Sequence, residues 1–234
     1  MNDLASAKAS FKDQAVIFSR KHNWIMCILY LGTFGSFIGF AAGFPLLIKS
    51  QFTGIDPVKY AFLGPLVGAL ARPFGGWISD KIKSGALITQ FVFIGMIVAV
   101  CGVIFFLPNN GEGGNFWGFF ACFLALFTLT GIGNGSTFMQ VPVIFLNMHQ
   151  KFAEEGKVSE EQARLDATKE GAAVIGFTAA FAAYGGFFIP KSYGTSIDLT
   201  GGVNAALIGF IIFYAICAAL NWWYYTRKGA EAKC

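Results

Sequence analysis

Long apolar segments, separated by polar links, constrain this chain more than any other feature of its sequence. A helix needs about 20 apolar residues to cross the hydrocarbon core of a bilayer. Segments of that length are Trp24–Ile48, Tyr60–Ile78, Ala86–Leu107, Phe116–Leu146, Gly171–Ile189 and Val203–Tyr225. Only 13% of the residues are charged, against about 25% in a soluble domain. We therefore predict an all-α membrane protein of six transmembrane helices.

The polar segments divide the chain into three parts. Residues 1–22 are predicted to form a cytoplasmic N-terminal segment, residues 23–226 the six-helix transmembrane domain, and residues 227–234 a cytoplasmic tail. The longest polar link, about residues 148–170, is rich in good helix formers and is predicted to be an exposed or interfacial helix. With the N-terminus in the cytoplasm, 13 of the 17 Lys and Arg residues lie inside and 3 outside. This asymmetry predicts that both termini are cytoplasmic.

One charged residue lies deep inside a predicted span. Arg72 precedes Asp80, at the helix end, by eight residues, which places it roughly 12 Å from that end of the helix. A buried guanidinium is costly in lipid, and no acidic residue lies within a span to pair with it. Its planar fork of donors suits a planar oxyanion, so Arg72 is a candidate anion-binding residue. The alternative is that Arg72 bonds backbone carbonyls or an acidic residue of a partner.

The spans also hold polar and small residues that a ligand could reach. Tyr30 and Phe34 lie one helical turn apart on the same face, and a tyrosine hydroxyl in lipid needs a hydrogen-bond partner. The string GIGNGSTFMQVP carries Asn134 within a polar patch, either as pore lining or as an interhelical hydrogen-bonding group. In GFTAAFAAYGGFFIP, Gly176 and Thr178 would present a small polar surface to an anion, or would serve packing instead.

Four strings, in the same order and spacing, resemble the C-terminal half of the NarK-type nitrate/nitrite porters of the major facilitator superfamily. They are LYLGTFGSFIGFAAGFPLL, FLGPLVGALARPFGGWISDKI, GIGNGSTFMQVPVIF and GFTAAFAAYGGFFIPKSYG. The resemblance implies half of that fold, a 3+3 inverted repeat of helices, and alternating access around a midplane site.

The resemblance also implies roles for individual residues. Arg72 corresponds to the substrate arginine of the family's C-terminal half, Tyr30 to its substrate-site tyrosine and Phe34 to its aromatic lid. The glycine-rich nitrate signature corresponds to Gly176 through Pro190, in which Gly185 and Gly186 are candidate gating residues.

A second family motif follows Arg72 in the same span. Gly76, Asp80 and Lys81 match the loop signature of the superfamily, although Gly85 comes later than the motif requires, which weakens the gating contact inferred from it.

The expected function is nitrate and nitrite transport across the bacterial inner membrane. Without Asp, Glu or His inside the spans to relay protons, the sequence favours nitrate/nitrite exchange over proton symport. The family's N-terminal half is missing, so the partner would be that half or a second copy of the chain. The alternative is a non-transporting assembly subunit or an inactive fragment.

Other classes of function find little support in the sequence. Metal-ligand spacing, a nucleophile with its base and a nucleotide-binding loop are not recognisable, so we expect no metal, no cofactor and no enzymatic activity. Basic residues form no long run, and nucleic acid is not an expected partner.

Overall fold

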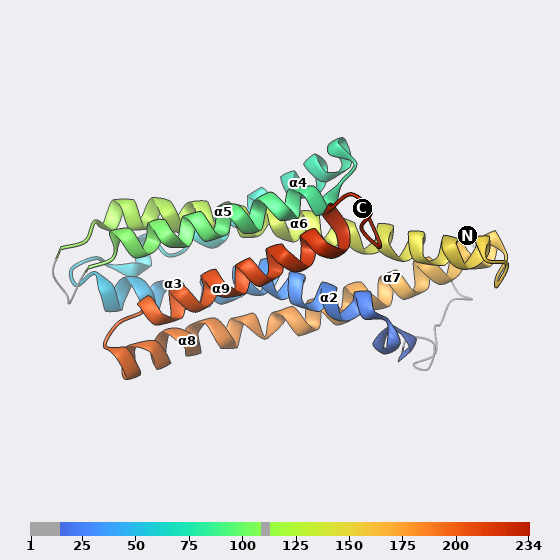
Figure 1. Ribbon diagram of the computed structural model, residues 1–234. Coiled ribbons are helices and arrows are strands. Elements are labelled where there is room, and N and C mark those ends of the chain that lie inside the picture. The colour runs from blue at the N-terminus through green and yellow to red at the C-terminus, as the bar shows by residue number, and fades with distance from the viewer. Residues whose placement is uncertain (1–14, 109–112) are drawn as a thin grey trace, which may run out of the picture.

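The computed structural model describes residues 15–108 and 113–234, so most of the predicted N-terminal segment lies outside the described residues. The described chain is an elongated bundle of helices (Figure 1). Its elements are η1 Val16–Ser19, α2 Lys21–Tyr30, η2 Leu31–Gly35, α3 Ser36–Gln51, η3 Pro57–Lys59, α4 Leu63–Ile82, α5 Gly85–Phe106, α6 Phe116–Glu154, α7 Glu160–Ala183, α8 Gly185–Thr200, α9 Asn204–Asn221 and η4 Trp222–Thr226.

Five helical stretches of the described residues are long and apolar enough to cross a membrane: α2 to α3, α5, α6, α7 to α8, and α9 with η4. These stretches correspond to five of the six predicted spans and confirm an all-α membrane protein. The second predicted span is α4, which has 20 residues and carries Arg72, Asp80 and Lys81. It lies along α6 within the bundle, although its charges make it less apolar than the others. The arrangement is consistent with half of the major facilitator fold.

The first span is one continuous helical stretch that widens in its middle. A π-helical segment, η2, joins α2 to α3, and such segments are frequent at functional sites. Gly39 lies against the start of α8, where a Cβ atom would stand 2.6 Å from the side chain of Ile189. Gly39 therefore allows a close helix–helix contact.

The longest helix, α6, is the centre of the bundle and contacts α2, α3, α4, α5 and α7. Aromatic rings fill the space between α6 and α3. The rings of Phe44 and Phe123 stack with centroids 4.6 Å apart, and Phe40 meets Phe123 edge to face at 5.7 Å. This apolar packing fixes the position of α6, which carries the polar residues discussed below.

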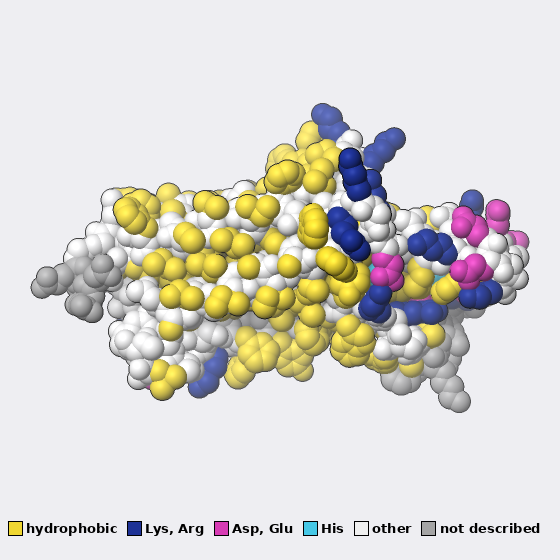
Figure 2. All heavy atoms as spheres, viewed as in Figure 1, with side chains coloured by type: hydrophobic (Ala, Val, Ile, Leu, Met, Phe, Trp, Pro, Cys, Tyr) yellow, Lys and Arg dark blue, Asp and Glu magenta, His cyan; other side chains and the backbone are white. Residues whose placement is uncertain are grey.

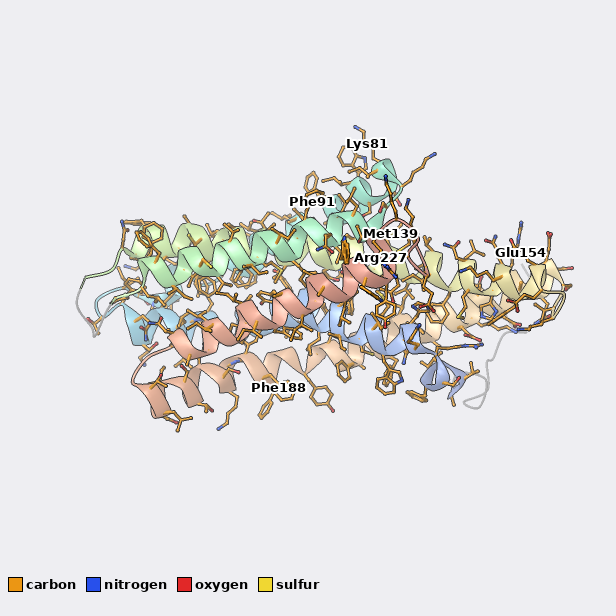
Figure 3. All side chains as sticks on the ribbon, in the orientation of Figure 1. Lys81, Phe91, Met139, Glu154, Phe188 and Arg227 are labelled. Carbon is orange, nitrogen blue, oxygen red and sulfur yellow. The ribbon has the colours of Figure 1, made fainter. Side chains whose placement is uncertain are left out.

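The fifth predicted span is divided at Tyr184, where α7 ends and α8 begins. The polar segment at residues 148–170 is helical but not a separate helix. It consists of the end of α6, a turn, and the first half of α7. Together these form a hairpin that extends beyond the other helices, with Glu154 near its tip (Figures 1 and 3). The helices stay continuous there because no helix-breaking residue interrupts the sequence until the turn at Gly156.

Most of the Lys and Arg side chains visible in Figure 2 gather toward the end of the bundle that carries this hairpin. We call it the basic end; it includes Arg20, Lys81, Lys151 and Arg227. The tail, residues 227–234, folds back against it: Lys151 donates to the carbonyl of Glu231 at 3.0 Å, and the Ser84 hydroxyl donates to the carbonyl of Cys234 at 2.8 Å.

Candidate functional site

Two helices meet through a hydrogen bond at the middle of the bundle. The Tyr30 hydroxyl, at the end of α2, donates to Oδ1 of Asn134 on α6 at 2.8 Å. Both side chains are buried, with exposures of 4% and 1%. The tyrosine therefore has the polar partner that its position in the membrane requires, and its hydroxyl oxygen still has acceptor capacity.

The first span and α4 bring Phe34 and Arg72 to the same place. The ring centroids of Tyr30 and Phe34 lie 5.2 Å apart, and Cζ of Arg72 lies 5.6 Å from the centroid of the Phe34 ring. Four predicted site residues thus form one cluster, in the order Arg72, Phe34, Tyr30, Asn134. The cation–π contact holds the guanidinium beside the tyrosine and leaves its N–H donors unused.

Glycines allow α4 to approach α6 closely enough for this cluster to form. A Cβ atom at Gly135 would clash with the carbonyl oxygen of Arg72, and it would stand 2.8 Å from the backbone nitrogen of Gly76. A similar backbone contact joins Gly131 to Gly68. The small residues around Asn134 therefore fix the distance between the backbone of Arg72 and the helix that carries the asparagine.

Within the described residues, the Arg72 guanidinium has neither an ion pair nor a hydrogen bond, and its side chain is exposed. A guanidinium offers five N–H donors in a fixed plane. With Phe34 beneath it and the Tyr30 hydroxyl nearby, the arrangement can bind a small planar anion by two parallel hydrogen bonds.

Gly176 and Thr178 lie apart from these contacts, on α7. The Thr178 hydroxyl is buried and donates to the carbonyl of Val174 in its own helix at 2.8 Å. A Cβ atom at Gly176 would meet open space. Within the described part of the chain, neither residue is joined to the Arg72 cluster by a hydrogen bond or a ring contact. A role in anion binding stays a prediction for both.

Gly185 and Gly186 begin α8, directly after the break at Tyr184. A Cβ atom at Gly185 would clash with backbone atoms of Gly35 in the π-helical segment, and one at Gly186 would stand 2.9 Å from the side chain of Ile38. Two irregular points of the chain therefore touch: the widened first span and the divided fifth span. Their role in gating stays a prediction.

The loop signature lies at the far end of α4. The ammonium nitrogen of Lys81 is 5.1 Å from the ring centroid of Trp77, and Lys81 projects away from the other helices (Figure 3). Asp80 is exposed and forms no ion pair within the described part of the chain. Gly76 packs loosely against Met139, 4.0 Å from its Cβ position.

A buried polar chain beside the site includes two residues that the sequence did not single out. Thr33 lies 3.3 Å from Thr137, oxygen to oxygen. Thr89 lies 2.8 Å from the Ser136 hydroxyl and accepts from Gln140 at 2.7 Å. Ser136, Thr137 and Gln140, on α6, belong to the predicted polar patch. Thr33 and Thr89 are single threonines in apolar segments, and the sequence does not indicate their hydrogen-bond partners.

The chain is similar to known transporters over almost its whole length. It is 44% identical to the nitrate/nitrite transporter NarU of Escherichia coli over 233 residues, which are 100% of this chain and 50% of the relative. It is 42% identical to a probable nitrate/nitrite antiporter, NarK2, of Thermus thermophilus, over 97% of the chain and 47% of the relative. A nitrite extrusion protein of Bacillus subtilis is 27% identical over 230 residues.

The chain spans about half the length of these curated relatives. No protein-family model matches it. The homology confirms the resemblance inferred from the sequence, and a match of this length is consistent with the C-terminal half of such a porter.

Proposed function

We propose that this chain, a homologue of NarK-type nitrate/nitrite porters, is the C-terminal half of a secondary transporter that moves nitrate and nitrite across the bacterial inner membrane. The observation that carries the proposal is the Arg72 guanidinium, which rests on Phe34 beside Tyr30 with its N–H donors unused. The proposal assigns no enzymatic activity to the chain. Both termini face the cytoplasm, as the basic residues favour.

In the proposed site, the anion receives two hydrogen bonds from the Arg72 fork, and Tyr30 lines the site with its hydroxyl proton given to Asn134. Asn134 orients the tyrosine through the bond between their side chains. Phe34 covers the anion from one side. Nitrate and nitrite are planar oxyanions, which match a guanidinium fork better than the single point charge of an ammonium. A rocking motion would then expose the site to each side of the membrane in turn.

Exchange of nitrate for nitrite is the transport mode that the cluster favours. None of its four side chains is a carboxylate or imidazole, the groups that relay protons in proton-coupled carriers. An incoming anion is then the natural substitute for the outgoing one, because it restores the charge balance at Arg72. One relative bears the name of a probable antiporter.

In this proposal, a partner completes the site. The partner is an N-terminal half or a second copy of the chain. The halves of such carriers are related by an axis along the membrane normal, which a two-fold dimer reproduces. The rival function is a non-transporting assembly subunit, in which an acidic residue of a partner would neutralise Arg72.

The test is uptake of labelled nitrate into proteoliposomes loaded with nitrite. One set of vesicles holds this chain alone, and another holds it with the N-terminal half of the Escherichia coli relative. We expect exchange in at least one set, lost in Arg72→Ala and also in Arg72→Lys, where the charge remains but the fork does not. Uptake retained in Arg72→Lys would contradict the proposed role of the fork.

A binding measurement separates a missing partner from a wrong assignment. Nitrate that binds the folded chain should raise its melting temperature in detergent, and the shift should grow with nitrate concentration. Arg72→Ala should abolish the shift, with chloride as the control anion. An absence of any shift in the wild-type chain, together with no exchange, would favour the assembly subunit.

A further inference from the structure

Three titratable side chains meet at the basic end of the bundle, away from the anion site. Arg20 precedes α2, His149 is near the end of α6, and Glu170 lies on α7. Nε and Nη2 of Arg20 donate to the two carboxylate oxygens of Glu170 at 2.9 and 2.8 Å. Nε2 of His149 lies 3.3 Å from Oε1 of the same carboxylate. One acidic group therefore faces two basic groups from different helices.

The carboxylate is buried and already has a charge partner. Glu170 is 8% exposed, and a buried carboxylate requires a paired cation with hydrogen bonds. The bidentate pair with Arg20 meets this requirement and ties the start of α2 to α7. The hydrogen bond with Glu170, ahead of the opposing effect of burial, raises the pKa of Arg20, so this residue stays charged.

His149 is buried, at 4% exposure, and its Nε2 has no aligned hydrogen bond within the described residues. An unprotonated ring nitrogen and a carboxylate oxygen are both acceptors, so they repel each other at this distance unless a proton lies between them. The nitrogen points at the oxygen that Nη2 of Arg20 also uses. A second cation at this oxygen would repel the first.

We propose that His149, Glu170 and Arg20 form a proton-binding latch. A proton from water binds the neutral imidazole of His149 and makes both ring nitrogens donors, so that the Nε2–H donates to Oε1 of Glu170. No other bond changes and nothing is oxidised. The proton leaves two positive charges on one carboxylate. Arg20, the more exposed cation at 24%, then releases Glu170. Protonation thus strengthens the link between α6 and α7 and loosens the link between α2 and α7.

Other charged groups around the latch are already engaged. Lys157 lies over the ring of Phe152 at 5.4 Å and pairs with Glu155 at 2.6 Å. Phe152 also contacts the ring of His149, with ring centroids 5.5 Å apart, and carries no charge. On the other side, a second cluster uses Lys21, His22, Lys151 and Glu231. These groups do not compete for Glu170 in the structure.

The latch is independent of the anion site, and its test needs no transport. Hydrogen exchange of the full chain in detergent, followed by mass spectrometry, reports on the backbone amides of residues 16–20. After correction for intrinsic exchange, we expect their protection to be severalfold lower at pH 5.5 than at pH 8.0, because acid supplies the proton that the latch binds. His149→Gln should remove this pH dependence. His22→Gln, the matched control, should retain it.

The arginine variant gives a second, independent readout. Arg20→Gln removes the more exposed partner, so protection at pH 8.0 should fall to the wild-type value at pH 5.5. The latch is overturned by a full pH response in His149→Gln, by no pH response in the wild type, or by unchanged protection in Arg20→Gln.

Discussion

The hydrogen bond between Tyr30 and Asn134 joins residues that are 104 positions apart in the chain. Both groups are buried, so each depends on the other for a polar partner. The same tyrosine ring lies against Phe34, which supports Arg72. A change at Asn134 therefore reaches the guanidinium through two intervening side chains.

A double-mutant cycle at this pair measures the contact. Tyr30→Phe and Asn134→Ala should each destabilise the folded chain by about 1 kcal/mol, because each leaves a buried polar group unpaired or removes a hydrogen bond. The double variant should cost less than the sum of the two, as measured by unfolding in mixed micelles. Additive changes in the free energy of unfolding would mean that the hydrogen bond contributes nothing to stability.

At the scale of the elements, α4 and α6 are held together by backbone contacts between glycines. The Cβ position of Gly135 is blocked by the backbone of α4, whereas that of Gly176 on α7 is open. Two glycines in similar glycine-rich strings thus differ in what surrounds them.

Alanine at each glycine gives opposite expectations for stability. Gly135→Ala should destabilise the chain by about 1–3 kcal/mol, because α4 must move away from α6 and take Arg72 with it. Gly176→Ala is the matched control and should unfold at nearly the wild-type temperature. Equal melting temperatures for the two variants would contradict this account of the α4–α6 contact.

The tail depends on an ion pair whose strength varies with pH. Lys21 donates to both carboxylate oxygens of Glu231, at 2.8 and 2.6 Å, and this bond lowers the pKa of Glu231. A lowered pKa in the folded state means that the stabilisation is complete above the usual carboxyl pKa, about 4.3, and is lost as the pH falls below it.

Amides of residues 230–233 should therefore lose protection as the pH falls from 6 to 3, measured by hydrogen exchange. The effect should stay under about 1 kcal/mol because the pair is half exposed. In Glu231→Gln, the tail should be less protected at pH 6 and should respond little to acid. A full acid response in that variant would point to another titrating group.

At the scale of the whole molecule, α4 presents an apolar outer face. Leu70, Phe74 and Trp77 are 63%, 59% and 59% exposed, and apolar side chains cover much of the bundle surface in Figure 2. Such a surface needs lipid or another protein to cover it. The exposed guanidinium of Arg72 on the same helix favours a partner near α4.

Cross-linking tests whether that partner is a second copy. In a chain whose native cysteines are replaced, Arg72→Cys should be linked between copies by a bis-maleimide if two equivalent sites face one cavity. Ile212→Cys, on the exposed face of α9, is the control and should link much less. Exclusively monomeric Arg72→Cys would favour a separate N-terminal half as the partner.

The sequence by itself determined the class of the molecule, because bilayer thickness sets the length of an apolar helix and the cost of a charge within a span makes Arg72 conspicuous. It also showed a resemblance to nitrate/nitrite porters, which the similarity to these relatives confirms. Helix packing decided the rest. The contact of Tyr30 with Asn134, the division of the fifth span at Tyr184, and the sharing of Glu170 by Arg20 and His149 depend on how helices are rotated against each other. Apolar length carries no information about that rotation, so only the tertiary structure supplied it.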